Sequence, residues 1–69
     1  MKEPKPNHLL KSLRGEQRRE AVAAAVGISV SALAAYENGM RNPSDGVKRA
    51  LASYYGTTVG KLFFGEGTP

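Results

Sequence analysis

The sequence predicts an all-α fold, a compact bundle of five short helices, and three observations support this prediction. Apolar residues recur at the three- and four-residue spacings of helices, and no stretch shows the sustained alternation of a strand. Glycines follow several of the apolar segments, at Gly15, Gly27 and Gly56, and serines precede two of them, at Ser29 and Ser44. The chain has 69 residues, 41% of them hydrophobic, which is enough for one small domain with its own core.

The two ends of the chain are predicted to lie outside the folded domain. Residues 1–7 contain two prolines and alternating charges, so we expect a flexible N-terminal arm. Residues 65–69 contain two glycines and a proline, so we expect a C-terminal tail. The folded domain is therefore predicted to span residues 8–64.

The first two helices are predicted from their caps and stop signals. The first covers about residues 8–14, because Asn7 can cap its start and Gly15 can end it. The second covers about residues 19–26, where alanines favour the helix and Gly27 can adopt the left-handed conformation that ends it. Their inward-facing residues are expected to be Leu9, Leu10, Leu13, Val22, Ala23 and Val26.

The other three helices are predicted in the same way. They cover about residues 30–38, 45–55 and 59–63. Each follows a side chain that can accept a hydrogen bond from the first turn, namely Ser29, Ser44 and Thr58. Their inward-facing residues are expected to be Leu33, Tyr36, Val47, Leu51, Val59, Leu62 and Phe63, with either Tyr54 or Tyr55.

The spacing at the centre of the chain predicts a helix-turn-helix. Ala23 is small where two steeply crossing helices would touch, and Gly27 allows the positive φ that the turn requires. Ile28 would lie under the turn, and Leu33 and Tyr36 would return the next helix to the core. The alternative is a plain helical hairpin in a small bundle, because the same residue types at helical spacing are common in cores.

Composition favours a nucleic-acid partner and argues against an enzyme. Lys and Arg number 10 against 6 Asp and Glu, giving a net charge of +4, which in a small domain favours a polyanion. There is no cysteine, so disulfides and thiolate metal sites are excluded, and the single histidine, His8, cannot form a zinc site alone. No nucleophile–base pair or glycine-rich phosphate loop is evident, so we expect no catalysis, no metal and no cofactor.

The same sequence gives an expectation for location. No apolar run approaches the length of a membrane span, and the start of the chain lacks the apolar centre of a signal peptide. We therefore expect a cytoplasmic protein that associates with the nucleoid and not with a membrane.

Four segments, LKSLRG, EAVAAAVGIS, YENGMRNPS and YYGTTVGKLFF, resemble the phage repressor/Cro-like helix-turn-helix family, also called the XRE family. The resemblance extends from about Leu9 to Phe64, and the GIS…YENG…NP spacing is its most specific part. It implies a five-helix bundle of the lambda-repressor-like type. It also implies a transcriptional regulator that binds operator DNA, commonly as a dimer.

The resemblance implies a set of DNA contacts. The start of the second helix is expected to contact phosphate through Arg18 and Arg19. The outer face of the third helix is expected to read bases through Ser29, Val30, Ser31, Ala34 and Ala35. The loop that follows is expected to contact the DNA backbone through Met40, by its N–H, and through Arg41 and Asn42. The resemblance also implies a structural ion pair between Arg14 and Glu37.

The chemistry of these residues leaves some roles open. Ser31 is the best base-reading candidate, because its hydroxyl both donates and accepts. Val30, Ala34 and Ala35 can pack on thymine methyl groups. The alternative is an exposed face of small residues with no reading role. The flanking arginines could likewise serve only to keep the surface solvated.

Three positions depart from the family's pattern. Arg18 stands where the family often has a Ser or Thr cap, which removes a cap worth on the order of 1 kcal/mol. Gly46 lies in the first turn of the fourth helix, where it should weaken the helix by roughly 1 kcal/mol relative to alanine. The third helix also lacks the Arg, Gln or Asn side chains that make bidentate base contacts.

Together these observations predict a sequence-specific regulator, with repression as its expected direction, that inserts the helix around residues 30–38 into the major groove of double-stranded operator DNA. A homodimer is expected to form through the C-terminal aromatic residues Tyr54, Tyr55, Phe63 and Phe64. The alternative is a protein-interaction or antitoxin-like adaptor module, because the alanine-rich outer face of the third helix also suits protein contact.

Overall fold

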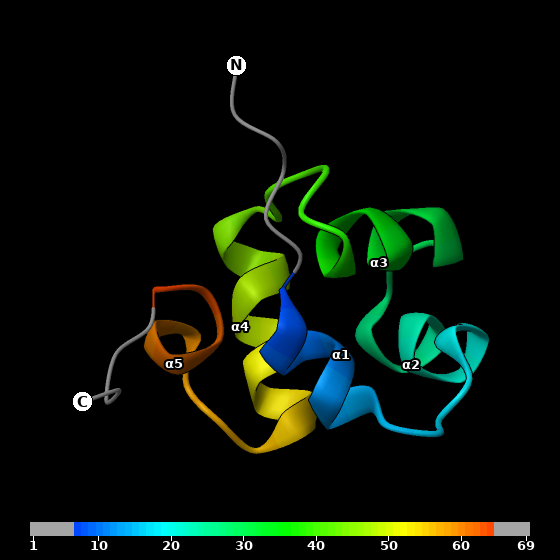
Figure 1. Cartoon of the computed structure of the whole chain (residues 1–69), viewed down its shortest axis with the longest axis horizontal. Coiled ribbons are helices and arrows are strands. Elements are labelled where there is room, and N and C mark those ends of the chain that lie inside the picture. Colours follow the sequence, from blue (N-terminus) through cyan, green and yellow to red (C-terminus); the bar gives the residue numbers. More distant parts are fainter. Residues whose placement is uncertain (1–6, 65–69) are drawn as a thin grey trace.

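The computed structural model describes residues 7–64, which form five helices and no strand (Figure 1). The helices are α1 (His8–Arg14), α2 (Arg19–Val26), α3 (Val30–Glu37), α4 (Asp45–Tyr55) and α5 (Val59–Phe63). The predicted all-α bundle of five helices is therefore confirmed, and the bounds differ from the prediction by about a residue, at the end of α3. The predicted tail and residues 1–6 of the predicted arm lie outside the described residues.

Four of the five helices begin with a side-chain cap. The hydroxyl of Ser29 accepts a hydrogen bond from the Ala32 N–H at 3.0 Å. Asn7, Ser44 and Thr58 cap α1, α4 and α5 in the same way. Arg18 makes no side-chain cap for α2, so the first N–H groups of this helix lack such an acceptor.

Asn7 belongs structurally to the folded domain, although the prediction placed it in the arm. Its side-chain oxygen accepts from the Leu10 N–H, and its side-chain nitrogen donates to the Leu62 carbonyl, both at 3.0 Å. Its backbone N–H donates to the Glu37 carbonyl at 2.8 Å. Asn7 thus connects the start of α1 to the end of α3 and to α5.

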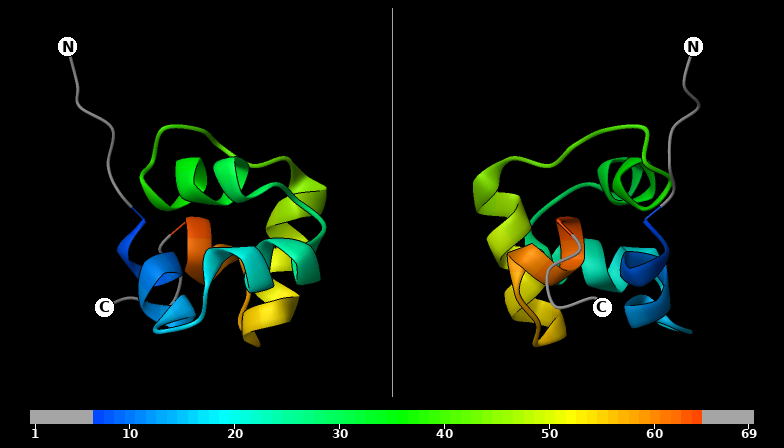
Figure 2. Two further views of the ribbon diagram at one scale, coloured as in Figure 1. Left: turned by 90° about the vertical axis from the view of Figure 1, so that its right-hand side faces the viewer. Right: turned by 60° about the vertical axis from the view of Figure 1, so that its left-hand side comes forward.

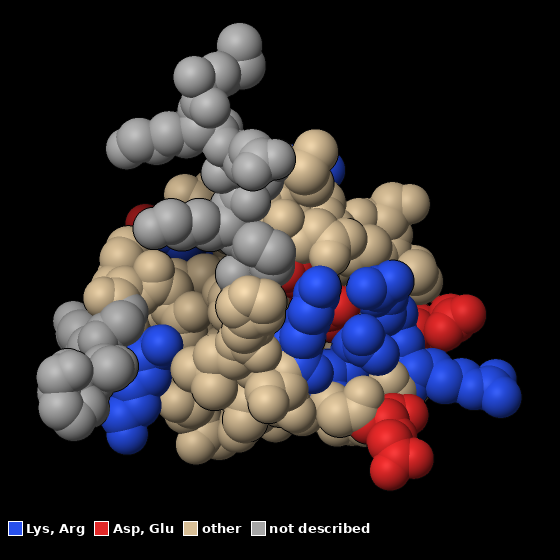
Figure 3. All heavy atoms as spheres, in the orientation of Figure 1, with Lys and Arg blue, Asp and Glu red and all other residues tan. Residues whose placement is uncertain are grey.

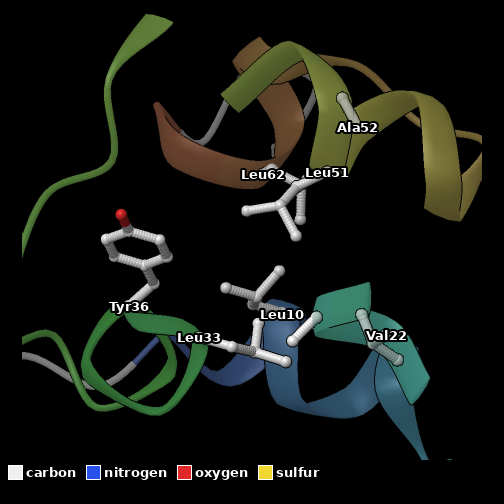
Figure 4. Packing of buried hydrophobic residues seen from close by; sticks show 8 residues of the cluster. Leu10, Val22, Leu33, Tyr36, Leu51, Ala52 and Leu62 are labelled. Atoms are coloured by element: carbon white, nitrogen blue, oxygen red, sulfur yellow. The ribbon is translucent and has the colours of Figure 1, made fainter. Parts of the chain in front are cut away.

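The core lies where the five helices converge. Its fully buried members are Leu10 of α1, Val22 of α2, Leu33 of α3 and Leu51 of α4. Figure 4 shows Leu10, Leu33 and Leu51 pointing toward one another. Burying each such side chain contributes roughly 1.5–3 kcal/mol. The rest of the buried apolar cluster consists of Ala23, Tyr36, Ala52 and Leu62.

One predicted core residue lies at the surface. Leu9 is 41% exposed, whereas Leu10 is fully buried and Leu13 is packed against the core. Leu10 and Leu13 are three residues apart and share one face of a helix that spans only His8–Arg14. The prediction that Leu9 faces inward was therefore wrong, because this short helix turns a single narrow face to the core.

The helices are arranged so that α2 and α3 form one side of the molecule. α2 packs on α3 and on α4, α1 packs on α3, and α5 packs on α4. Figure 2, left, views this side directly and shows α2 and α3 next to each other in front of the rest. The pair is thus supported from behind by α1 and α4.

Within residues 7–64 no single helix is long and apolar enough to cross a membrane. α2 and α3 together meet a length and composition criterion for a span, but the pair is bent by 104°. Some of its apolar side chains, Val22, Ala23 and Leu33 among them, are buried in the core, whereas Val30 is exposed.

Candidate nucleic-acid interface

The turn between α2 and α3 is tight, and two of its N–H groups are bonded to the end of α2. Residues 27–29 join the two helices, whose axes differ by 104°. Gly27 has φ 87° and ψ 34°, the left-handed conformation, and its N–H and that of Ile28 both donate to the Ala23 carbonyl at 2.8 and 2.9 Å. Ala23 itself is buried, at 2% exposure. A helix-turn-helix has two helices at about 90–120° joined by three or four residues, and this pair matches it.

The outer face of α3 is exposed and poor in polar groups. Ser29, Val30 and Ser31 are exposed, and Ala34 and Ala35 are half-buried. The Ser29 hydroxyl is already used as the cap of α3. The Ser31 hydroxyl has no hydrogen-bond partner within residues 7–64, so it remains available to a ligand. The structure thus brings the predicted base-reading residues together on one surface.

The start of α2 lies against α3 and carries positive charge. A shallow hollow is bordered by Arg14, Arg18, Arg19, Glu20 and Val30. Figure 3 shows Lys and Arg side chains gathered over α1 and the start of α2, with acidic side chains at the edge of the group. The uncapped N–H groups of α2 add the partial positive charge of a helix N-terminus. Arg18 and Arg19 are therefore placed where an anion lying along α3 would meet them.

The loop after α3 was expected to contact the DNA backbone through three residues, and only two of them are free to do so in this structure. The Met40 N–H donates to the Ala35 carbonyl at 2.9 Å, which closes the end of α3. Because this N–H is already bonded, the expected backbone donation from Met40 to DNA is not available in this structure. Arg41 and Asn42 are exposed, and the Arg41 guanidinium lies 6.0 Å from the centre of the Tyr36 ring. These two side chains remain the candidates for contact on this flank.

The carboxylate of Glu37 is completely buried and is shared by two arginines. Arg14 donates to it from Nε at 2.6 Å and from Nη2 at 3.1 Å, so the ion pair implied by the resemblance is present. Arg19 also donates to it, from Nε at 3.0 Å. The hydrogen bond to Glu37 raises the pKa of Arg14 above its ordinary value, against the opposing effect of burial.

The second arginine of this cluster was missed by sequence reasoning. Arg19 was expected to contact phosphate only, yet it lies against a carboxylate 18 residues along the chain. No local pattern indicates this contact, because it depends on how α2 crosses α3. The cluster thus links the predicted structural pair to a predicted DNA-contacting residue.

Two adjacent tyrosines near this cluster differ in their hydroxyl environments. The Tyr54 hydroxyl donates to the side-chain oxygen of Gln17 at 2.7 Å. The Tyr55 hydroxyl is buried and has no hydrogen-bond partner within residues 7–64. Burial raises the pKa of Tyr55, and the negative charge of Glu37 raises it further.

The C-terminal aromatic residues are only partly covered. Phe64 is 65% exposed, and Tyr54 is also exposed, whereas Phe63 packs against the core. Lys48 is buried, and its ammonium lies 5.7 Å from the Phe63 ring centre and 4.8 Å from that of Phe64. Sequence reasoning did not predict this role for Lys48, because a lysine in α4 normally stays in solvent.

In the part of the chain that the structure describes, no group of three or more His, Cys, Asp or Glu side chains could hold a metal ion.

α2 and α3 cross at a steep angle and are joined by a short turn, and the exposed face of α3 lies beside cationic side chains. These features define a helix-turn-helix protein. Residues 8–62 match the sequence profile of the family described as Helix-turn-helix domain, and the chain belongs to this family. Comparisons with curated proteins and with solved structures gave no match. Membership supports DNA binding and a regulatory role, and domains of this family are typically not enzymes.

Proposed function

We propose that this protein is a sequence-specific regulator of transcription, acting as a repressor, that inserts α3 into the major groove of double-stranded DNA. The observation that carries the proposal is the exposed outer face of α3 lying next to the cationic start of α2. The major groove is about 12 Å wide and accepts one α-helix. With α1 and α4 behind the pair, α3 can enter the groove without moving the core.

Phosphate contacts on both flanks of α3 would hold it in the groove. At one flank lie Arg18, Arg19 and the uncapped start of α2, a favourable place for an anion. At the other lie Arg41 and Asn42, which are exposed after the end of α3. Such contacts set the position and orientation of a protein on DNA but do not read its sequence.

Base reading would rest on few groups. Ser31 has the free hydroxyl of this face and can donate to or accept from a base edge. Val30, Ala34 and Ala35 offer methyl groups that suit contact with thymine. The face lacks long amide or guanidinium side chains, so we expect DNA shape and half-site spacing to supply a large share of specificity.

The proposal includes a family assignment and an assembly. We assign the chain to the phage repressor/Cro-like group and place it on DNA in the cytoplasm as a homodimer. We propose that the exposed side chains of Phe64 and Tyr54 take part in this pairing. The Lys48 ammonium lies near the rings of Phe63 and Phe64. A symmetric dimer would bind two inverted half-sites.

Fluorescence anisotropy with a labelled duplex tests this function. Because neutralised phosphates release counterions, log affinity should fall linearly with log salt, by about 0.9 per phosphate contact. Arg18→Ala should weaken binding to all sequences alike and reduce this slope by about 1. Ser31→Ala should instead change preference at one base pair and leave the slope unchanged. Binding that does not depend on salt would contradict the proposed mechanism.

A second candidate function is a protein-interaction or antitoxin-like adaptor module. It is favoured by the small, largely apolar side chains on the outer face of α3, where Val30 is 40% exposed. In that case a protein partner would compete with labelled DNA in the same assay. Failure to bind any duplex, together with saturable binding of a protein to this face, would favour this candidate.

A further inference from the structure

The cluster around Glu37 has more positive than negative charge. One buried carboxylate is bound by two guanidinium groups, so one positive charge is left uncompensated within the cluster. The carboxylate already receives two hydrogen bonds from Arg14, at Nε and Nη2. Arg19 is therefore not needed to pair the charge of Glu37, and its own charge remains effective at the surface.

The two arginines use their donors differently. Arg14 has a 19% exposed side chain and uses all three of its nitrogens, with Nη1 donating to the Gln17 carbonyl at 2.8 Å. Arg19 has a 35% exposed side chain and donates only through Nε. Within residues 7–64 no hydrogen bond donated by the Nη groups of Arg19 is found. This unequal use points to a structural Arg14 and an Arg19 still able to bind a ligand.

Guanidinium geometry decides which part of Arg19 remains free. A guanidinium can bind an anion by its Nε–Nη edge or by the edge formed by its two Nη groups. Glu37 occupies Nε, so the edge formed by the two Nη groups remains. Arg19 borders the hollow that Arg18 and Val30 also border, beside the start of α3. A phosphate entering there would meet an arginine whose orientation is already fixed.

We propose that Glu37 is a positioning residue for DNA binding: its buried carboxylate holds Arg19 by Nε and presents the free Nη edge to a DNA phosphate. This inference rests on the proposed DNA-binding function. It gives Glu37 a second role besides fixing Arg14. Fixing a long side chain before binding reduces the conformational entropy lost when the phosphate contact forms.

A double-mutant cycle tests this role on DNA. Glu37→Gln keeps the shape of the side chain but loses its charge. It should weaken duplex binding about fivefold when Arg19 is present and less than about twofold in the Arg19→Ala background. Equal weakening in both backgrounds would mean that Glu37 acts only through the fold. Tighter binding by Glu37→Gln would mean that Glu37 sequesters Arg19. Either result overturns the inference.

A second variant covers the case in which Glu37→Gln does not fold. Arg19→Lys keeps the positive charge and leaves the pair of Arg14 with Glu37 intact, but lysine lacks the two-edged fork. We expect Arg19→Lys to lose most of the affinity that Arg19→Ala loses. If Arg19→Lys binds as tightly as the unaltered chain, charge alone suffices and the positioning role is wrong.

A measurement without DNA separates this inference from the proposed function. In ¹⁵N relaxation of arginine Nε–H groups, Arg19 should be ordered in the free protein, whereas exposed Arg18 should have an order parameter below about 0.6. Mobility of Arg19 equal to that of Arg18 would overturn the positioning role even if DNA binds. An ordered Arg19 in a protein that binds no duplex would instead overturn the proposed function, and with it the role of Glu37 on DNA.

Discussion

The inner and outer sides of the helix-turn-helix differ in how closely their side chains are surrounded. On the inner side, Val22 and Leu33 are completely buried in the core cluster, and the buried Glu37 bonds to arginines of α1 and α2. On the outer side, Val30 and Ser31 are exposed and small. A change on the inner side should therefore alter the free energy of unfolding, whereas a change on the outer side should alter DNA affinity. Measuring both quantities for each variant tests this division.

The largest effect is expected at Glu37. Glu37→Ala removes the carboxylate that binds two arginines, so it should lower the free energy of unfolding by about 3–5 kcal/mol. Urea denaturation followed by circular dichroism measures this loss. Glu20→Ala, at an exposed position in α2, is the matched control and should change stability little. An unchanged unfolding midpoint for Glu37→Ala would show that the buried cluster does not stabilise the fold.

The next effect separates the two arginines that share Glu37. Arg14→Ala removes two hydrogen bonds to a buried charge and should cost about 1.5–3 kcal/mol of stability. Arg19→Ala removes one contact of a more exposed side chain and should cost less than about 1 kcal/mol. DNA affinity should show the reverse order, with the larger loss for Arg19→Ala. If Arg19→Ala lost more stability and Arg14→Ala lost more DNA affinity, the division between a structural inner side and a DNA-binding outer side would be wrong.

Smaller effects on stability are expected at the helix starts, where one substitution adds a cap to α2 and another removes the cap of α3. Arg18→Ser supplies the acceptor that α2 lacks and should raise the free energy of unfolding by about 0.5–1 kcal/mol. The same change should weaken DNA binding, because it removes a cation from the hollow beside α3. Ser29→Ala, which removes the existing cap of α3, should lower stability by about 1 kcal/mol. If Arg18→Ser improves both stability and DNA binding, Arg18 is not a phosphate contact.

The smallest effect concerns the two tyrosines. Tyr55→Phe removes a buried hydroxyl that has no partner and should raise the free energy of unfolding by about 0.5–1 kcal/mol at neutral pH. Tyr54→Phe loses an exposed hydrogen bond to Gln17 and should lower it by about 0.5 kcal/mol. If the two substitutions changed the free energy of unfolding equally, the hydroxyls of Tyr54 and Tyr55 could not differ in hydrogen bonding as described.

Tyr55 also leads us to expect that the stability of the fold depends on pH. The pKa of Tyr55 is raised by burial and by the charge of Glu37, partly offset by Arg14, so the fold favours the neutral hydroxyl. This stabilisation is fully present below the ordinary tyrosine pKa of about 10 and is lost as pH rises through the raised value. Denaturation curves measured from about pH 8 to about pH 11 should show a smaller alkaline loss for Tyr55→Phe than for Tyr54→Phe.

The sequence predicted the helices well because their ends depend on local chemistry. A serine, threonine or asparagine before a helix bonds to the helix's own first turn, as Ser29 bonds to Ala32. Gly27 ends α2 because its own backbone adopts the left-handed conformation. Ala23 was also predicted correctly as a buried residue, because its small side chain lies on the same helical face as the buried Val22 and the partly buried Val26.

The candidate site was less predictable because its contacts depend on tertiary packing. The expectation for Arg19 omitted Glu37, and the expectation for Met40 assumed a free N–H that Ala35 in fact accepts from. The burial of Lys48 and its contact with two phenyl rings likewise depend on how α5 packs on α4. The DNA-contacting roles of the outer-face residues remain predictions, since no packing requirement fixes their identity.

Selection of bound fragments from a pool of random duplex DNA tests the central claim most directly. The pool is presented to the unaltered chain and, as a matched control, to the Arg18→Ala/Arg19→Ala double variant. A helix-turn-helix dimer that reads the major groove should enrich a common sequence in two inverted half-sites about one helical turn apart. The double variant should retain far less DNA. Recovery of fragments with no common sequence, in equal amounts from both proteins, would contradict sequence-specific DNA binding by this protein.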